Sequence, residues 1–396
     1  MSLRIPKGTV YAATALSTIA TFYHFSYLFF LLRDRYSFDN RLNLRVAALH
    51  GAIYVFAAWQ GGRFAERRGY TASLTAGFVG LFLCMVVGAL VSSAAALLAV
   101  MAVYTIVLLL VWPALEALAI ADEPPERVPH LVGLYNLTWS GAAALAYFTG
   151  GPLYDRIGAR MIFGIPAVIF LVQLVFLFWL SRRPASASPR PVADVAAVVS
   201  SMPDDFRGSP ERSVTFLRLA WLANPLSYMA IYTLLAVMPG LAASLGLTPT
   251  QVGLFCSIWF FARLGSFILL WQWPGWHYRF RFLAGGYASL MASFLAILLA
   301  PNLAVLVIAQ VVFGASAGLT YYSSLFYSMD LSEAKAEHGG LHEAGVGVGI
   351  CAGPLVGTAA LQMFPAWPQA GAIAVTAVLT GGLVTMLAVW RSGARS

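Results

Sequence analysis

Charged residues are scarce in this sequence. Only 10% of its 396 residues are Asp, Glu, Lys or Arg, and 60% are hydrophobic, whereas a soluble domain carries about 25% charged residues. A chain with so few charges could not cover a soluble surface. Apolar runs of about 20 residues recur, which is the length of a helix that crosses a bilayer, and the alternating segments of about 10 residues that are typical of a membrane β-barrel are missing. The sequence therefore predicts an all-α polytopic membrane protein.

Cysteines are few, and nucleotide-binding motifs are missing. Cys84, Cys256 and Cys351 each lie inside an apolar run and form no CxxC pair, so we expect no disulfide. His338 and His342 are four residues apart, but no third ligand accompanies them, so we expect no metal site. Without a phosphate-binding loop or a Rossmann fingerprint, ATP-driven transport is disfavoured and no cofactor is expected.

One long polar segment interrupts the apolar sequence. The stretch from Ser181 to Ser213, SRRPASASPRPVADVAAVVSSMPDDFRGSPERS, contains five prolines and many charged residues, a composition typical of a flexible linker. It divides the chain into an N-terminal half, residues 1–180, a linker, residues 181–215, and a C-terminal half, residues 216–396.

The apolar runs predict six membrane-spanning helices in each half. In the first half they are expected near residues 9–32, 43–62, 71–91, 96–120, 130–152 and 161–180. In the second half they are expected near residues 216–242, 249–271, 282–300, 303–329, 341–362 and 369–390. The first of these helices follows Arg4 and Lys7 and is too long for a signal-peptide core, so we interpret it as a retained helix.

Lys and Arg are distributed unevenly over the expected loops. With the N-terminus inside, 17 of the 24 Lys and Arg residues fall in inner segments, six in outer segments and one, Arg263, inside a helix. Because inner loops carry the excess of positive charge, this bias predicts a multi-pass protein of a bacterial inner or plasma membrane with both termini and the linker in the cytoplasm. It also accounts for the net charge of +8 without a nucleic-acid partner.

The turn after the second expected helix carries a family resemblance. Gly62-Arg-Phe-Ala-Glu66-Arg67-Arg-Gly69 is similar to the signature turn of the major facilitator superfamily, Gly-x-x-x-Asp-Arg-x-Gly. Glu66 stands where Asp is usual, and the second half has only a remnant at Pro274–Arg279. The resemblance implies twelve helices in two pseudo-symmetric six-helix bundles and secondary transport by alternating access. It also implies that Gly62, Glu66, Arg67 and Gly69 stabilise one conformation.

Gly-Pro pairs recur in the fifth helix of each half. Gly151-Pro152 and Gly353-Pro354 lie 202 residues apart, as expected of repeated halves with a substrate path between them. The second pair resembles the Gly-Pro motif of the family's antiporters, and we interpret both as bending and packing elements. The run from Gly151 to Arg160 also resembles the signature turn, but the charge bias places it outside, so we interpret it as a coincidental outer turn.

Arg263 is the clearest candidate for a substrate contact. A charge within a membrane helix costs roughly 2.5–3.5 kcal/mol at mid-depth, so we expect such a residue to have a functional or structural role. One interpretation is a contact for an anionic or carbonyl-bearing substrate, and the other is a structural pair with a carboxylate or with helix-end carbonyls.

Polar residues at helical spacing mark three further helices. On the helices that the resemblance places around the central cavity, the substrate candidates are Thr18, Thr21 and His24 in the first, Asn224, Tyr228 and Tyr232 in the seventh, and Tyr321 and Ser324 in the tenth. Weaker candidates are His50 and Tyr54 in the second helix, and Asn136, Trp139 and Ser140 in the fifth. The alternative interpretation of each set is hydrogen bonding between helices.

Three residues are candidates for ion coupling. Glu116 follows Trp112-Pro113 near an inner helix end and either pairs with Arg67 or another inner-loop base or titrates as a coupling acid. His342 and Glu343 open the eleventh expected helix. Glu343 there is either a first-turn cap or one member of a proton-coupling pair with His342.

Two other functional classes compete with a carrier. Gly314-Ala-Ser316-Ala-Gly318 matches the nucleophile pattern of serine hydrolases, which requires a strand-to-helix turn. A transporter-like sensor or scaffold would use the linker as a partner site. We favour a monomeric secondary carrier, not an enzyme, which moves a small organic solute across the bilayer as a symporter or antiporter, with proton coupling left open.

Overall fold

The described part of the chain is helical throughout. The computed structural model describes residues 6–121, 123, 127–182, 210–331 and 335–393, and these residues form helices and short connections without a strand. The expected fold class is therefore confirmed.

The helices follow one another with short turns. In the N-terminal half they are α1 (Lys7–Tyr36), α2 (Asn40–Arg68), α3 (Tyr70–Leu90), α4 (Ala94–Leu108), α5 (Trp112–Ile120), α6 (Val128–Ile157) and α7 (Ala159–Ser181). In the C-terminal half they are α9 (Pro210–Ser244), α10 (Pro249–Cys256), α11 (Ile258–Gln272), the short 3-10 helix η3 (Pro274–Trp276), α12 (Phe280–Leu298), α13 (Leu303–Leu331), α14 (Lys335–Met363) and α15 (Ala370–Gly393).

Two of the expected continuous helices are each broken into two pieces. The helix expected over residues 96–120 separates into α4 and α5, because Pro113 has no N–H to donate to the preceding turn and its ring displaces the carbonyl four residues earlier. The chain there tightens, and the Leu110 and Val111 amides donate three residues back, at 3.1 and 3.0 Å. The helix expected over residues 249–271 breaks at Ser257, whose hydroxyl donates to the Leu254 carbonyl at 2.8 Å and so competes with the helical ladder.

The helices are long and apolar enough to cross a membrane. Eleven spans among the described residues meet this condition, with α4 joined to α5 and α10 joined to α11. α6 is more polar but has 30 residues, so its length of roughly 45 Å at 1.5 Å per residue also suffices. Together they give the twelve spans of the predicted fold.

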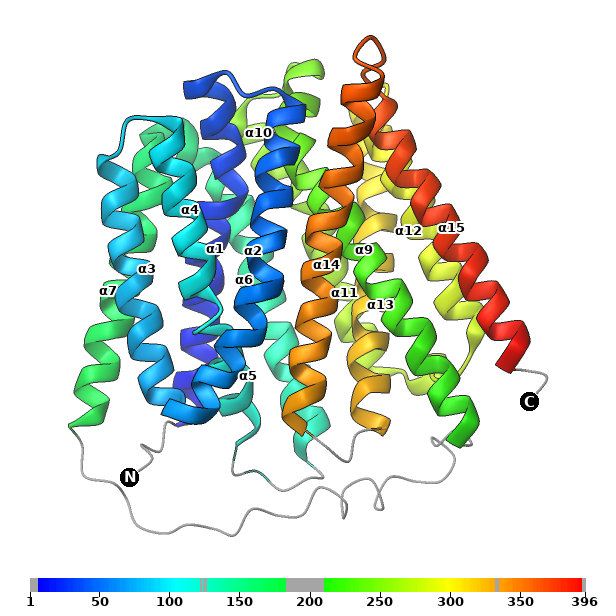
Figure 1. The fold of residues 1–396 in the computed structure, drawn as a ribbon, viewed down its shortest axis with the longest axis horizontal. Helices are drawn as coiled ribbons and strands as arrows, with labels where there is room; N and C mark the ends of the chain where they lie inside the picture. The colour runs from blue at the N-terminus through cyan, green and yellow to red at the C-terminus, as the bar shows by residue number, and fades with distance from the viewer. Residues whose placement is uncertain (1–5, 122, 124–126, 183–209, 332–334, 394–396) are drawn as a thin grey trace.

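The two halves lie side by side, with their ends at two levels (Figure 1). α1 begins, α7 ends, α9 begins and α15 ends at the lower level, which we call the termini end, and the other level is the opposite end. Most of the linker expected over residues 181–215 lies outside the described residues. Residues 210–215 belong to α9, so the expected linker was too long at its C-terminal side.

The halves are in contact along two seams. α2 packs against α14, and α6 packs against α10 and α11. Glycines allow the closest approaches: a Cβ on Gly253 of α10 would lie 2.8 Å from the Gly151 Cα of α6, and a Cβ on Gly51 of α2 would collide with the backbone of Cys351 in α14. Small residues at such crossings let helix backbones touch, so the glycines set the distance between the halves.

The most deeply buried spans are among those that the resemblance places around the central cavity. In the most apolar window of α1, 72% of the residues are buried, and 67% are buried in that of α9, against 22% in that of α15. α1 and α9, the first spans of their halves, therefore form the centre, and α15 lies at the periphery, as Figure 1 shows.

Candidate substrate cavity between the two halves

A cavity of about 160 Å³ lies between the halves and receives side chains from both. From the N-terminal half it is lined by Thr18, Thr21, Phe22, Phe25 and Ser26 of α1, His50 and Tyr54 of α2, Tyr104 and Leu108 of α4, Trp112 and Glu116 of α5, and Tyr135 and Trp139 of α6. From the C-terminal half it is lined by Tyr228, Ile231, Tyr232 and Leu235 of α9, Trp259, Phe260 and Arg263 of α11, Tyr321 of α13, and Glu343, Val346 and Ile350 of α14. Aromatic rings and a few polar groups thus surround one central space.

Arg263 lies in this cavity within a cage of aromatic rings. Its side chain is only 3% exposed, and its guanidinium carbon lies 4.7 Å from the centre of the Trp139 ring, 5.0 Å from Tyr321 and 5.5 Å from Phe267. Such ring faces attract a cation by cation–π interaction. The faces therefore replace part of the hydration that the guanidinium has lost.

Arg263 has few polar partners. One terminal nitrogen donates a long hydrogen bond of 3.5 Å to the Tyr228 hydroxyl, and its Nε has no hydrogen-bond partner. In the described part of the chain, no carboxylate lies within 4.0 Å of it. The structural ion pair considered as an alternative is thus not formed among these residues, and the cation is left open to a ligand.

The polar face of α1 serves two purposes. Thr18 and Thr21 line the cavity as expected. The Thr18 hydroxyl donates to the Thr14 carbonyl of its own helix at 2.8 Å, whereas the Thr21 hydroxyl donates to no carbonyl of its helix and lies near the Tyr104 hydroxyl. Thr21 is therefore the more available of the two to a solute.

Tyrosines form the wall in the C-terminal half. Tyr228 of α9 lies 6.4 Å, centre to centre, from both the Tyr232 and Tyr321 rings. Through Tyr232 the wall continues to His50 of α2, whose ring is stacked at 5.9 Å. The candidate tyrosines of the seventh and tenth helices are thus brought together in one surface.

Glu343 joins the two halves. The Tyr54 hydroxyl of α2 donates to a Glu343 carboxylate oxygen of α14 at 2.5 Å. α14 begins at Lys335, which places Glu343 two turns inside the helix, so the first-turn capping role was wrong. The side chain of His342 lies outside the described residues, and its pairing with Glu343 stays a prediction.

Glu116 also faces the cavity, from the N-terminal half. It lies one turn before α5 ends at Ile120, so the cavity reaches toward the termini end. The described residues contain no ion pair between Glu116 and Arg67, and a pair with another inner-loop base stays a prediction.

Three of the substrate candidates are buried outside the lining. His24 of α1 is turned into its own half, where its ring lies 4.5 Å from that of Tyr104 and 5.5 Å from that of Phe163. Asn224 and Ser324 lie one turn away from Tyr228 and Tyr321 and are 2% and 1% exposed. The polar residues at helical spacing therefore indicated helices that border the cavity, but not every one of these residues lines it.

The cavity contains residues that the sequence did not mark. Tyr104, Trp112, Tyr135 and Trp259 line it, and each is an aromatic residue inside an apolar run. The weaker candidates His50, Tyr54 and Trp139 also line it. In a membrane helix, an aromatic residue is as common at a lipid-facing or packing position as at a cavity wall. Only the three-dimensional arrangement therefore shows that these four residues line the cavity.

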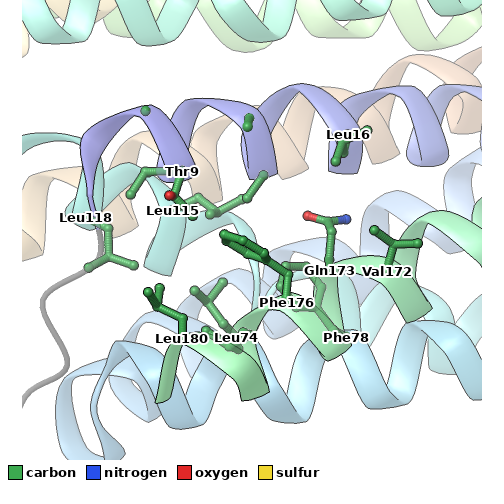
Figure 2. A pocket seen from close by; sticks show the side chains of 15 residues that line it. Thr9, Leu16, Leu74, Phe78, Leu115, Leu118, Val172, Gln173, Phe176 and Leu180 are labelled. Atoms are coloured by element: carbon green, nitrogen blue, oxygen red, sulfur yellow. The ribbon is translucent and has the colours of Figure 1, made fainter. Parts of the chain in front are cut away.

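A second, larger cavity lies within the N-terminal half. It has a volume of about 350 Å³ between α1, α3, α5 and α7, and Figure 2 shows its mostly apolar lining around Gln173. The Gln173 carbonyl oxygen accepts a hydrogen bond from Ser17 at 3.1 Å. No charged side chain lines this cavity, and no helix of the other half borders it. The cavity between the halves is therefore the candidate site.

The profile of the Major Facilitator Superfamily matches residues 8–223, which include most of the lining from α1 to α6 and the signature turn. The chain belongs to the Major Facilitator Superfamily. None of the curated proteins compared with it matches in sequence.

Solved structures of this superfamily share the arrangement over nearly the whole chain. A peptide transporter, POT, in complex with sulfate is 14% identical with a TM-score of 0.75, over 98% of this chain and 94% of that one. A mutant of the nucleoside transporter NupG is 12% identical with a TM-score of 0.68, over 98% and 99%. The human organic anion transporter MFSD10 is 16% identical with a TM-score of 0.63, over 97% and 98%. At such identities the likeness shows the fold.

The superfamily's signature turn has the expected position. Gly69 ends α2 with a φ of +87°, a conformation that favours glycine, and its N–H donates to the Ala65 carbonyl at 2.9 Å. Glu66 and Arg67 are exposed at the termini end and enter no ion pair among the described residues. Their conformational role stays a prediction for another state of the transporter, as does that of Gly62.

The two Gly-Pro pairs have different surroundings. Gly151, followed by Pro152, lies at the contact between halves, against Pro249 and Gly253. Gly353, followed by Pro354, packs against the Met229 backbone of α9 within its own half. The nearest neighbours of Gly151 thus lie in the other half and those of Gly353 in its own half, and the bending role of both pairs remains a prediction.

The hydrolase alternative is not supported. Ser316 lies in the middle of α13, which is helical from Leu303 to Leu331, instead of at the strand-to-helix turn that the nucleophile pattern requires. Together with the family, this indicates a transporter and not an enzyme.

Proposed function

We propose that this protein is a secondary transporter that moves a small organic solute across the membrane by alternating access. The proposal is supported by its superfamily, by the cavity enclosed between two helical bundles and by the charged groups in that cavity. The similar structures include transporters named for peptides, nucleosides and organic anions, so these are the first solute classes to try.

The observation that carries the proposal is the guanidinium of Arg263, which lies inside an aromatic cage and forms no ion pair with any described residue. A guanidinium presents a planar fork of donors that fits a carboxylate or a phosphate with two parallel hydrogen bonds. The surrounding rings offer flat apolar surface. We therefore infer a solute with an anionic or carbonyl-bearing group next to an apolar or aromatic body.

We infer an inward-facing state from the contacts between the halves and from the reach of the cavity. The halves are joined near the middle of their spans by the edge-to-face contact of Phe22 with Phe260, at 5.2 Å, and at the opposite end by Asp155 and Thr250. Toward the termini end the lining continues to Glu116. With the termini in the cytoplasm, as the excess of inner Lys and Arg predicts, the solute would enter or leave on the cytoplasmic side.

Proton coupling is assigned to Glu343 in this proposal. Its hydrogen bond with Tyr54 links a titratable group to the contact between the halves. Protonation of the carboxylate weakens a hydrogen bond that favours the charged form, so gain or loss of the proton changes how tightly α2 and α14 hold together. Glu116 is the second candidate, because it faces the same cavity.

The proposal is tested first by finding the solute and then by measuring its flux. Purified protein is screened by thermal shift against a library of peptides, nucleosides and organic anions at two pH values. The solute found is then followed into proteoliposomes with and without a proton gradient. Flux driven by the gradient supports a coupled carrier, flux down the solute's own gradient supports a carrier without coupling, and absence of both supports a sensor or scaffold.

Variants at Arg263 connect the flux to the site. Arg263→Gln is expected to lower uptake at subsaturating solute at least 10-fold, since a hydrogen bond to a charged group contributes about 1.5–3 kcal/mol. Arg281, which lies over the Phe282 ring at 5.1 Å outside the cavity, provides the matched control Arg281→Gln. Unchanged uptake in folded Arg263→Gln would remove Arg263 from the substrate site.

A further inference from the structure

The charges of the central cavity are distributed over both halves of the protein. Three charged side chains line it: Arg263 and Glu343 from the C-terminal half and Glu116 from the N-terminal half. Within the described residues none of the three takes part in an ion pair. The cavity thus presents one basic and two acidic side chains that form no ion pair with one another.

The two carboxylates differ in their surroundings. Glu343 accepts the 2.5 Å hydrogen bond from Tyr54, and so part of its charge is already balanced at the contact between the halves. Glu116 has no such hydroxyl partner among the described contacts, although it faces the same space as Arg263. Of the two, Glu116 is therefore the group whose charge needs a partner that a ligand would bring.

Tyrosines line the same cavity as these ionisable groups. The Tyr228 hydroxyl accepts a hydrogen bond from Arg263 at 3.5 Å, and Tyr135 lines the cavity together with Glu116 and Glu343. A molecule that contacts both Arg263 and Glu116 would consequently pass along phenol rings. Such a wall suits an apolar or aromatic body between two charged ends.

From this arrangement we propose that the transported solute is a zwitterion, with its anionic group on Arg263 and a cationic amine on Glu116. This inference rests on the proposed transport function and names the class of its substrate. The carboxylate of the solute pairs with the guanidinium fork, and its ammonium group donates to the Glu116 carboxylate. The solute thus supplies Arg263 and Glu116 with ion-pair partners that they do not have among the described residues. The charge of Glu343 is left for coupling.

The two proposed contacts lie on different halves of the protein, so the solute's charges affect how the halves move relative to each other. Arg263 belongs to α11 and Glu116 to α5, so a zwitterion connects the two bundles, while a solute with one charge is held by one bundle only. A ligand shifts a conformational equilibrium only by its difference in affinity between the states. A bridging solute therefore favours the state in which the bundles close around it, and a singly charged analogue binds without driving that closure.

Matched triplets of solutes test the proposal. Each triplet contains an amino acid or short peptide, its N-acetyl derivative, which keeps only the anionic group, and its amide, which keeps only the cationic group; phenylalanine, N-acetylphenylalanine and phenylalaninamide form the first. Thermal shift gives binding, and uptake into proteoliposomes gives transport. We expect the zwitterion to bind about 10-fold to 100-fold more tightly than either derivative, and to be the member that is transported.

Glu116→Gln provides the decisive variant. It should reduce the affinity for the zwitterion to that for the N-acetyl derivative and leave the latter unchanged, which also shows that the variant is folded. Glu123→Gln, which removes a carboxylate at the termini end outside the cavity, is the charge-matched control and should keep the preference. Arg263→Gln should produce the converse pattern and remove the preference over the amide.

Two results would overturn the inference and leave the transport function standing. One is a singly charged or neutral solute that is transported as well as its zwitterionic counterpart. The other is a preference for zwitterions that survives Glu116→Gln or disappears only in Glu343→Gln. If instead no solute from the triplets or from the broader library is transported by the wild-type protein, the proposed transport function itself fails.

Discussion

The Asp155 carboxylate accepts a hydrogen bond from the Thr250 backbone amide, at 2.8 Å, and another from the Thr250 hydroxyl. Asp155 lies at the end of α6, and Thr250 lies in the first turn of α10, so these bonds connect the two halves at the opposite end of the molecule. The amides at a helix N-terminus attract negative charge. The turn from Gly151 to Arg160, which the sequence suggested to be a coincidental copy of the signature, therefore holds a contact between the bundles.

Removing the charge of Asp155 should favour opening of the opposite end. Asp155→Asn keeps an acceptor but loses the charge-assisted bonds, which at this exposed position contribute about 1 kcal/mol, equivalent to a roughly fivefold shift in population. Spin labels at Arg160 and Ser244, in a background without the native cysteines, report the distance between the halves there. We expect a larger population at long distance.

The control for this measurement is another aspartate at the same end. Asp39 accepts a hydrogen bond from the Leu42 amide at 2.8 Å and so caps α2 within one half. Asp39→Asn should lower stability slightly without changing the distance distribution. Equal distributions in wild-type protein and Asp155→Asn would show that the bond does not contribute to closure.

The glycine crossing between α6 and α10 gives a second prediction. A Cβ at Gly253 would lie 2.8 Å from the Gly151 Cα and amide nitrogen, and backbone atoms cannot yield as a flexible side chain does. Gly253→Ala should therefore separate the helices, keep the opposite end from closing and lower transport at least 10-fold. Gly265, in the same membrane span, has open space at its Cβ position, so Gly265→Ala should retain transport within about twofold. A transport-competent Gly253→Ala protein would contradict this.

Much of the fold is predictable from the sequence because the bilayer imposes it. Every spanning segment needs about 20 apolar residues, and the apolar runs predict the ends of the spans to within six residues. The breaks were harder to predict. Pro113 was visible, but the tightened turn at Leu110 and Val111 depends on backbone bonds, and the break at Ser257 depends on a hydroxyl that elsewhere in membrane helices causes none.

The sequence predicted several of the helices that border the candidate site and its buried arginine, but it did not predict all of the residues that line the cavity. Arg263 could be identified because a cation in lipid is costly. Tyr135 and Trp112 could not, since aromatic side chains suit lipid, core and cavity alike. Glu343 was assigned to the wrong position in its helix because the helix was expected to begin near residue 341, whereas α14 already begins at Lys335.

The hydrogen bond between Tyr54 and Glu343 predicts that a variant at Tyr54 loses proton-driven uptake but keeps solute binding and exchange. Tyr54→Phe removes the hydroxyl that donates to Glu343 at 2.5 Å and leaves the ring in the cavity wall. Uptake driven by a proton gradient should fall several-fold, while exchange of labelled for unlabelled solute across the membrane should continue, since exchange requires no net proton movement. Tyr36→Phe removes a comparable bond, to the Ser92 carbonyl at 2.9 Å, within one half and serves as control. A parallel loss of uptake and exchange would assign Tyr54 to binding instead.

His277 predicts a pH dependence of stability. It lies in the connection between α11 and α12, outside the membrane spans, with its ring stacked on that of Phe326 at 3.9 Å. Burial lowers the pKa of His277 from 6.5 to about 4, because the apolar surroundings disfavour the charged imidazolium. Between these two values the unfolded chain binds a proton that the folded protein does not.

The folded state should therefore lose stability as the pH falls from about 6.5 toward 4, since stability rises with pH wherever the unfolded state binds more protons. At pH 5 the loss due to His277 amounts to about 1–2 kcal/mol relative to pH 7.5, at roughly 1.4 kcal/mol per pKa unit. His277→Gln, which cannot be protonated, should show a smaller decrease in unfolding temperature between pH 7.5 and pH 5 than the wild-type protein. Other histidines contribute equally to both proteins, so their effect cancels in the difference. Identical decreases would mean that His277 is as easily protonated in the folded protein as in the unfolded chain.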